Sequence, residues 1–193
     1  MALTLQRIGE IHLPSVSIMP NDSAVHSTPS NHDDNHWRRS APAQLISHIL
    51  TRYHQRHREQ LPELIRLARR VEQVHDQQAL CPNGLADHLG DLQQELESHM
   101  LKEEQILFPM LRRGDRTLAR GPISVMRFEH EQHNQGLDKL HELTNNLMLP
   151  SGACRTWQAL YAQLSEFCTD LEEHIRLEND ILFSNPSEVP TAL

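Results

Sequence analysis

The chain has 193 residues and carries 18 Lys and Arg against 26 Asp and Glu, a formal net charge of −8. This length suits one domain with an additional tail, and the acidic balance argues against a general nucleic-acid-binding surface, which would be basic. No apolar run approaches the ~20 residues that span a bilayer, and the N-terminus lacks the continuous apolar segment of a secretory signal.

Cysteine usage indicates the expected compartment. The three cysteines, Cys81, Cys154 and Cys168, are scattered and form no CxxC pair, so they do not suggest a disulfide framework. A reducing cytoplasm is therefore the expected location. We interpret Cys168, which lies in an amphipathic segment, as a small core residue.

Residues 1–41 contain several prolines and a polar run, and we expect an irregular N-terminal tail there. From Pro42 onward, apolar residues recur at steps of three and four, which is the pattern of amphipathic helices. Turn-forming sequences separate the helical segments, and the alternation typical of strands is absent. The pattern predicts helices over residues 42–74, 85–111, 123–147 and 154–183.

Short connections between long helices make consecutive helices antiparallel neighbours. The sequence therefore predicts an all-α fold, an up-down-up-down four-helix bundle. The expected domain organisation has three parts: an irregular N-terminal tail over 1–41, the helical bundle over 42–185 and a C-terminal tail over 186–193.

Histidine is unusually abundant, with 14 copies against 4 Phe, 2 Trp, 2 Tyr and 3 Cys. The second and fourth predicted helices contain related segments, HMLKEEQILF from His99 and HIRLENDILF from His174. The first and third each contain a His-x-x-His segment, which starts at His54 and at His130. A helix pair that carries HxxH and then HxxxE therefore occurs twice, and this repeat predicts a pseudo-twofold site.

The spacing gives the repeat a chemical meaning. Residues four apart lie on one face of a helix, so each His–Glu pair points the same way. With a rise of about 1.5 Å per residue, six such side chains fall in one layer of the bundle. Imidazoles and carboxylates buried together are costly unless they are paired or bind a metal ion. We therefore predict a two-metal site with six ligands: His54, His99, Glu103, His130, His174 and Glu178.

Other polar residues near this layer are ambiguous. His57 and His133, the second histidines of the HxxH segments, can be ligands or can lie outside the ligand set. Glu95, one turn before His99, is a candidate hydrogen-bond acceptor for that ring, and Glu129 could line the approach to the site. Three further histidines lie away from the layer: His75, His88 and His141.

The predicted donor set restricts the metal. Nitrogen and oxygen ligands without thiolate suit iron, manganese or zinc. A bridging carboxylate can span the separation of about 3.5–4 Å that is usual in two-metal sites. Two imidazoles and two bridging oxygens for each ion would leave open positions for a small ligand.

Several sequence blocks resemble the hemerythrin-like repair-of-iron-centres family of stress-responsive bacterial proteins: WRRSAP, RYHQRHREQLPEL, SHMLKEEQILFPM, GPISVMRFEHE and HIRLENDILF. The resemblance covers roughly Trp37 to Phe183. It implies a non-haem di-iron centre in a four-helix bundle, with two iron ions, carboxylate bridges and an oxo or hydroxo bridge. It also assigns the family's metal ligands to the six residues of the predicted layer.

Full-length members of this family carry an N-terminal domain with a Cys-Cys pair, whereas no cysteine precedes Cys81 here. We interpret residues 1–41 as a remnant of that domain. The resemblance then points to a truncated form associated with denitrification. We predict a cytoplasmic di-iron protein that binds nitric oxide and lowers its free level, and that acts as a buffer rather than as a turnover catalyst. Neither a nucleic acid nor a membrane is expected as a partner.

Four other functions stay open. The first is an iron donor for the repair of damaged iron–sulfur clusters, with iron–sulfur proteins as clients, although the missing thiols argue against a hand-over that needs them. The second is reduction of nitric oxide at the paired irons. The third is reversible binding of O₂, which four histidines fit less well than five. The fourth is a helical module that holds zinc without small-ligand chemistry.

Overall fold

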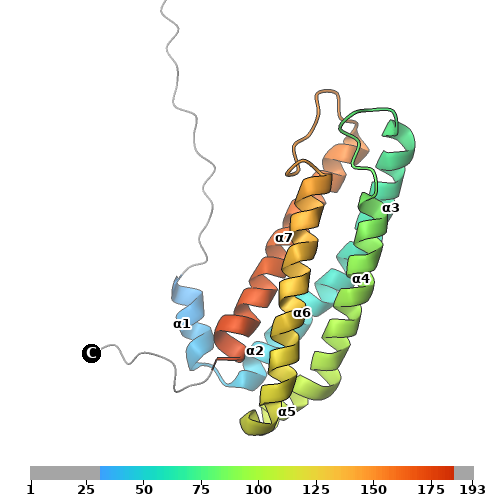
Figure 1. Cartoon of the computed structure of the whole chain (residues 1–193). Helices are drawn as coiled ribbons and strands as arrows, with labels where there is room; N and C mark the ends of the chain where they lie inside the picture. Colours follow the sequence, from blue (N-terminus) through green and yellow to red (C-terminus); the bar gives the residue numbers. More distant parts are fainter. Residues whose placement is uncertain (1–30, 185–193) are drawn as a thin grey trace, which may run out of the picture. The chain divides into compact units, whose positions relative to one another are not determined.

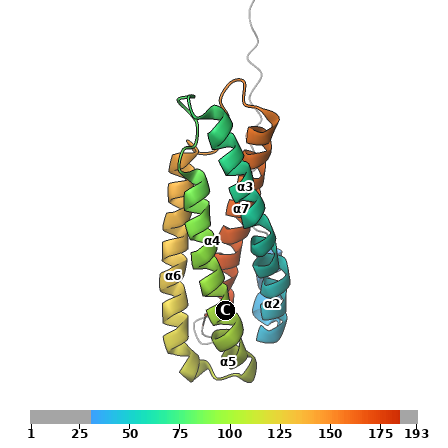
Figure 2. The same ribbon diagram turned by 90° about the vertical axis from the view of Figure 1, so that its right-hand side faces the viewer.

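The computed structural model describes residues 31–184, and every regular element in that range is helical. The helical segments join end to end into four long rods, which pack side by side as a bundle (Figure 1). Their segments are α2 (Pro42–Ile49), η1 (Leu50–His54) and α3 (Gln55–His75); α4 (Leu85–Lys102), η2 (Glu103–Leu107) and α5 (Phe108–Arg113); α6 (Arg116–Leu143); and α7 (Arg155–Leu177) with η3 (Glu178–Leu182). Neighbouring rods meet through α3 and α4, α4 and α6, α6 and α7, and α7 and α3 (Figure 2). The predicted up-down-up-down bundle is confirmed.

The three η segments are single π-helical turns within these rods. In η2 the N–H of Phe108 bonds to the carbonyl of Glu103, and in η3 the N–H of Phe183 bonds to the carbonyl of Glu178 at 2.8 Å. Pro109 is the second residue after η2 and has no N–H to continue the α-helical hydrogen bonds, which favours the change of pattern there. Because π turns concentrate at functional sites, these turns draw attention to the residues that they carry.

Two clusters of buried apolar side chains fill the bundle. One cluster includes Leu64, Trp157 and Leu164, and the other includes Ile49 and Phe108. Along the rods, the stretch between the two clusters carries buried histidines and glutamates. A polar layer therefore divides the hydrophobic core into two parts.

The break between the second and third long helices is shorter than the sequence predicts. The sequence indicates a break over residues 112–122, but α6 already begins at Arg116, directly after a turn in which Gly114 has a φ of 80°. Pro122 lies inside α6, close to its start, where it removes a single backbone hydrogen bond. Full burial of Ala119 holds the additional turns against the core.

A further helix, α1 (Asn31–Arg39), lies where the sequence predicts an irregular tail. Arg176 of α7 pairs with Asp34 of α1 at 2.7 Å and with Glu173 at the same distance. This contact joins residues 142 positions apart in the sequence, so local patterns could not reveal it. The predicted C-terminal tail and the first 30 residues of the predicted N-terminal tail lie outside the described residues.

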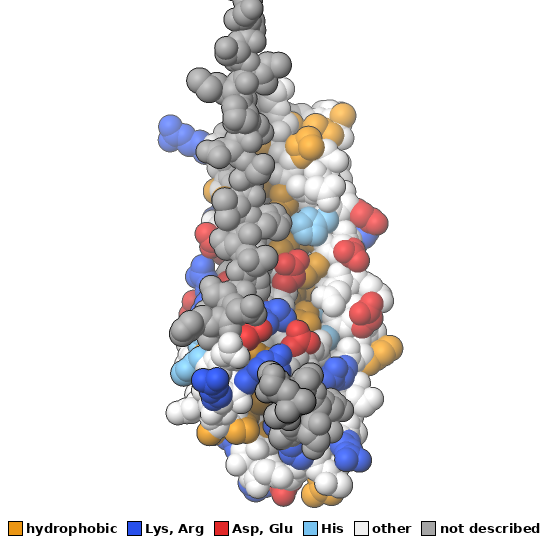
Figure 3. Space-filling view, turned by 90° about the vertical axis from the view of Figure 1, so that its left-hand side faces the viewer, with side chains coloured by type: hydrophobic (Ala, Val, Ile, Leu, Met, Phe, Trp, Pro, Cys, Tyr) orange, Lys and Arg blue, Asp and Glu red, His pale blue; other side chains and the backbone are white. Residues whose placement is uncertain are grey.

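The described surface carries charges of both signs. Figure 3 shows acidic and basic side chains interspersed over one face. No helix in the range 31–184 combines the length and the apolar character needed to cross a membrane. The described face thus shows no large, uniformly basic area.

The buried apolar clusters should dominate the stability of the bundle. Leu64 is completely buried, so Leu64→Ala should lower the free energy of unfolding by about 2–5 kcal/mol. Leu118, on α6, is 70% exposed, and Leu118→Ala should change it by less than about 0.5 kcal/mol. Urea denaturation of both variants checks this expectation. Equal losses in the two variants would contradict the described core.

Candidate metal centre

The six predicted ligands lie together in the polar layer of the bundle. Their side chains are at most 1% exposed, and they form two groups of His and Glu that could hold metal ions, with Glu103 and Glu178 common to both groups. Each rod contributes: His54 ends η1, His130 lies on α6, and η2 and η3 each begin with the shared glutamate of that rod. The π turns, which the sequence did not predict, therefore lie at the candidate ligands.

The first group joins His54 and His174 to the two glutamates. The Nε2 atoms of these histidines lie 3.2 Å apart. Nε2 of His54 is 3.4 Å from Oε2 of Glu103, and Nε2 of His174 is 3.2 Å from Oε1 of Glu178. The two imidazoles thus come from different rods and meet at one point.

The second group repeats this arrangement with His99 and His130. Their Nε2 atoms are 3.0 Å apart. Nε2 of His99 is 3.5 Å from Oε2 of Glu103, and Nε2 of His130 is 3.1 Å from Oε2 of Glu178. Each glutamate therefore contacts one histidine of each group, as a bridging ligand in a two-metal site must.

Hydrogen bonds outside the layer fix the tautomers of three histidines. Nδ1 of His54 bonds to Glu104 at 2.8 Å, Nδ1 of His99 bonds to Glu129 at 2.9 Å, and Nδ1 of His130 bonds to Oδ1 of Asn179 at 3.0 Å. Carboxylate and amide oxygens accept hydrogen bonds, so each ring donates its Nδ1–H. Nε2 of each ring then points into the layer, and in a neutral ring with Nδ1–H this atom carries the lone pair.

The arrangement fits bound cations. Two Nε2 lone pairs that face each other at 3.0 Å, as in the second group, repel unless a proton or a metal ion lies between them. Both carboxylate oxygens of Glu103 and of Glu178 are buried and have no hydrogen-bond partner among the described residues. Because buried polar groups without partners are costly, a donor set of this kind is suited to metal ions, and nitrogen and oxygen donors suit iron, manganese or zinc.

Burial sets the proton affinity of the layer. It lowers the pKa of His54 to about 4 and that of His99 to about 3. Burial, followed by the charge of Glu178, raises the pKa of Glu103. Burial also disfavours the charged form of Glu178, but the adjacent His174 and His130 outweigh it and hold the pKa of Glu178 below its usual range. In the folded protein, His54 and His99 are therefore neutral at neutral pH, as metal ligands must be.

The two ambiguous histidines are buried beside the ligand groups but belong to neither. The ring of His57 stacks on His174 with centroids 5.4 Å apart, and the ring of His133 meets His99 edge-on at 4.8 Å. One nitrogen of each, Nε2 of His57 and Nδ1 of His133, is buried without a described partner. His57 and His133 therefore pack directly against the rings of His174 and His99, respectively.

His75 and His88 take part in other contacts. Nε2 of His75 lies 3.1 Å from the thiol of Cys154, and Nε2 of His88 lies 2.8 Å from the carbonyl of Gly136. His141 belongs to neither of the two ligand groups.

Two residues that support the ligands were missed in the sequence. Glu104 and Asn179 each directly follow one of the shared glutamates, and this matching position in both copies of the repeat was the available signal. Glu95 was wrongly considered as the acceptor for His99, because the acceptor in the structure is Glu129 of the neighbouring helix. Nε2 of that ring points into the layer, so its Nδ1 must face outward to α6.

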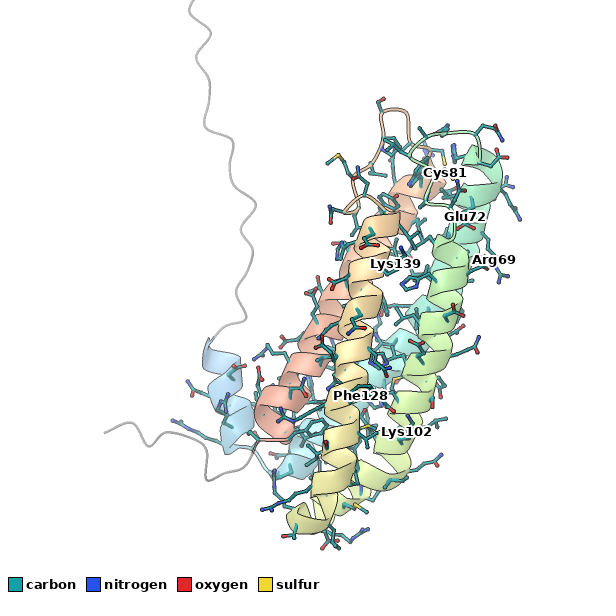
Figure 4. The ribbon with its side chains drawn as sticks, viewed as in Figure 1. Arg69, Glu72, Cys81, Lys102, Phe128 and Lys139 are labelled. Carbon is teal, nitrogen blue, oxygen red and sulfur yellow. The ribbon has the colours of Figure 1, made fainter. Side chains whose placement is uncertain are left out.

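Glu129 also connects two rods. One of its oxygens accepts the hydrogen bond from His99, and the other bonds to the ammonium group of Lys102. Figure 4 shows Lys102 on α4 at nearly the same level as Phe128 on α6, the residue that precedes Glu129. This ion pair ties the outer support of His99 to both helices.

Comparisons with known proteins agree with this architecture. Residues 45–185 match the hemerythrin HHE cation binding domain. A protein of Edwardsiella ictaluri (strain 93-146), named iron-sulfur cluster repair protein YtfE, is 50% identical over 182 residues, which are 94% of this chain and 81% of the relative. Proteins with the same name from Yersinia pestis (strain Pestoides F) and Yersinia pseudotuberculosis serotype O:1b (strain IP 31758) are 48% identical over 93% of this chain and 80% of theirs.

The chain therefore belongs to the hemerythrin-like repair-of-iron-centres family. This membership contradicts the prediction of a nitric-oxide buffer, because these relatives are named for the repair of iron–sulfur clusters. That prediction gave too much weight to the missing N-terminal thiols. The polar layer is built by the four rods alone, so the absence of those thiols does not bear on what this layer can hold.

Removal of a shared glutamate should reduce metal binding. Glu103→Leu deletes a carboxylate common to both ligand groups, so the metal content per chain after anaerobic loading with ferrous iron should fall by at least half. Glu131→Leu, an exposed change on α6, is the matched control and should leave the metal content unchanged. Metal analysis by atomic emission checks both, and full loading of Glu103→Leu would remove this residue from the ligand set.

The metal-free protein should lose stability as the pH falls from 7 to 5. Burial is the main cause of lowered pKa values, to about 4, 2, 3 and 3, at four histidines: His54, His57, His99 and His133. In the unfolded chain the pKa of a histidine is about 6.5. Below that pH the unfolded state therefore binds more protons than the folded state, and the free energy of unfolding decreases. The raised pKa of Glu103 acts in the opposite direction but involves only one group.

Thermal unfolding of the chelator-treated protein at the two pH values measures this effect. The expected result is a lower Tm at pH 5 than at pH 7. An equal or higher Tm at pH 5 would mean that these histidines are not buried as neutral rings in the metal-free fold.

Proposed function

We propose that this protein binds two iron ions in the polar layer and donates iron for the repair of damaged iron–sulfur clusters. One ion would be held by His54 and His174 and the other by His99 and His130, with Glu103 and Glu178 bridging them. The observation that carries the proposal is the set of converging Nε2 atoms and unpartnered carboxylate oxygens in a chain about half identical to proteins named for cluster repair.

The donor set suits an ion that is carried and given away. Neutral imidazoles carry no charge, so the two bridging carboxylates provide the only negative charge in the ligand set. Part of the positive charge of two divalent ions is therefore left uncompensated. No cysteine belongs to either ligand group, so the site lacks the thiolates that hold iron in iron–sulfur clusters. An acceptor with free thiolates can therefore compete for the ion.

The clients in this proposal are iron–sulfur proteins that have lost iron. We propose a cytoplasmic location, where such clients and reduced thiols are present. We also keep the division into a tail over 1–41, a bundle over 42–185 and a tail over 186–193 as part of this proposal, with α1 as a helix at the end of the first segment. The bundle, which carries all six ligands, is the part that holds the cargo.

Iron transfer can be tested directly. The protein loaded with ferrous iron is incubated anaerobically with an apo [2Fe–2S] ferredoxin and sulfide. Free sulfide is then removed, ferricyanide takes one electron from each ferrous ion of the assembled cluster, and the visible absorption of the oxidised cluster is measured. Cluster formation should scale with the iron supplied on the protein. Glu178→Leu should form less than about a tenth as much cluster, because it lacks a shared ligand, whereas Glu131→Leu should behave like the unchanged protein.

A free ferrous salt at the same iron concentration serves as the positive control for the acceptor. If the salt forms clusters and the loaded protein, with its iron measured, does not, the protein is not an iron donor to this acceptor class and the proposal fails.

A further inference from the structure

The two halves of the site follow the same plan. Each shared glutamate is followed at the fifth position by a phenylalanine, and this phenylalanine stacks on the candidate ligand ring of the other helix in the same pair. Phe108 stacks on His54 with centroids 5.7 Å apart, and Phe183 stacks on His130 at 6.0 Å. The residues directly after the glutamates, Glu104 and Asn179, accept hydrogen bonds from the Nδ1 atoms of the same two rings. Internal symmetry therefore extends beyond the ligands.

The symmetry is broken at the position directly before the first histidine of each HxxH segment. The residue before His130 is Glu129, which accepts the hydrogen bond from Nδ1 of His99. The residue before His54 is Tyr53, and its ring lies parallel to the ring of His174, with an interplanar angle of 4° and centroids 5.4 Å apart. A hydrogen-bond acceptor in one half is thus replaced by a stacked aromatic ring in the other.

The residue that pairs with Glu129 also has a different counterpart in the other half. Lys102, one residue before Glu103, bonds to Glu129. The corresponding residue before Glu178 is Leu177, which is buried among apolar side chains. The ion pair of one half is therefore an apolar pair in the other half, and Nδ1 of His174 is buried without a hydrogen-bond partner among the described residues.

Outer hydrogen bonds matter for metal affinity. A carboxylate that accepts the Nδ1–H of a ligand histidine fixes the ring and makes Nε2 a stronger donor, and loss of such a partner typically weakens metal binding about 10–100-fold. Both histidines of the second group have an outer acceptor, whereas in the first group only His54 has one. His174 is held between Tyr53 and His57 by ring packing.

We propose that the position of His54 and His174 holds its ion less tightly than the position of His99 and His130, and that it releases its ion first. This inference rests on the proposed function, because it assigns the transferable iron to one half of the site. The exchange of Glu for Tyr at matched positions of the repeat makes one ion exchangeable while the other stays to keep the layer occupied.

Release to a chelator tests the inference. The protein loaded with two ferrous ions is mixed anaerobically with excess ferrozine, and the coloured complex is followed in time. We expect two phases of equal amplitude whose rates differ by about tenfold or more. Glu129→Tyr removes the outer hydrogen-bond acceptor of His99 and should accelerate the slow phase about tenfold, without changing the fast one. Tyr53→Glu provides the missing acceptor and should slow the fast phase.

The control is Glu131→Tyr, the same chemical change at an exposed position of α6, and it should leave both phases unchanged. Because Tyr53 is buried, the Tyr53→Glu protein is assessed by circular dichroism first, and Glu129→Tyr alone suffices if it does not fold. Release in a single phase from the unsubstituted protein, or a Glu129→Tyr variant in which only the fast phase changes, would overturn the inference.

The chelator assay involves no iron–sulfur protein, so the two proposals fail separately. Two phases of release without transfer to a client would remove the proposed function alone. Transfer with single-phase release would remove only the difference between the two positions.

Discussion

The structure depends on one costly feature, a layer of buried imidazoles and carboxylates that divides the hydrophobic core of the bundle. Four histidines and two glutamates, at most 1% exposed, converge there without enough hydrogen bonds among themselves. Apolar clusters on both sides exclude water from this layer and hold the rods in register. Bound cations would convert the layer from a liability into a cross-link between all four rods.

Sequence patterns predicted the bundle and the convergence of the six candidate ligand residues, because both depend on spacing along a helix. The i, i+4 pairs His99–Glu103 and His174–Glu178 need only a continuous helical rod to face inward. The outer support was harder to predict, since Glu129 reaches His99 from a neighbouring helix and Asp34 reaches Arg176 from α1. Such contacts depend on helix packing, which local periodicity does not contain.

Local periodicity also does not predict the π turns of the backbone. Periodicity predicts a helix through residues 103–107 and 178–182 equally well with α or π geometry, because one additional residue per turn is a small change of pattern. The sequence of residues 112–122 predicts a break between helices, but α6 begins at Arg116, and burial of Ala119 against the core favours this earlier start. At the start of α6, tertiary packing therefore outweighs the local sequence signal.

The central claim is that two iron ions lie in this layer, one for each pair of converging imidazoles. Anomalous X-ray diffraction at the iron absorption edge, from crystals of anaerobically loaded protein, tests it most directly. The account predicts two peaks about 3.5–4 Å apart, one beside His54 and His174 and the other beside His99 and His130, both in contact with Glu103 and Glu178. A single peak, or peaks elsewhere in the bundle, would contradict it.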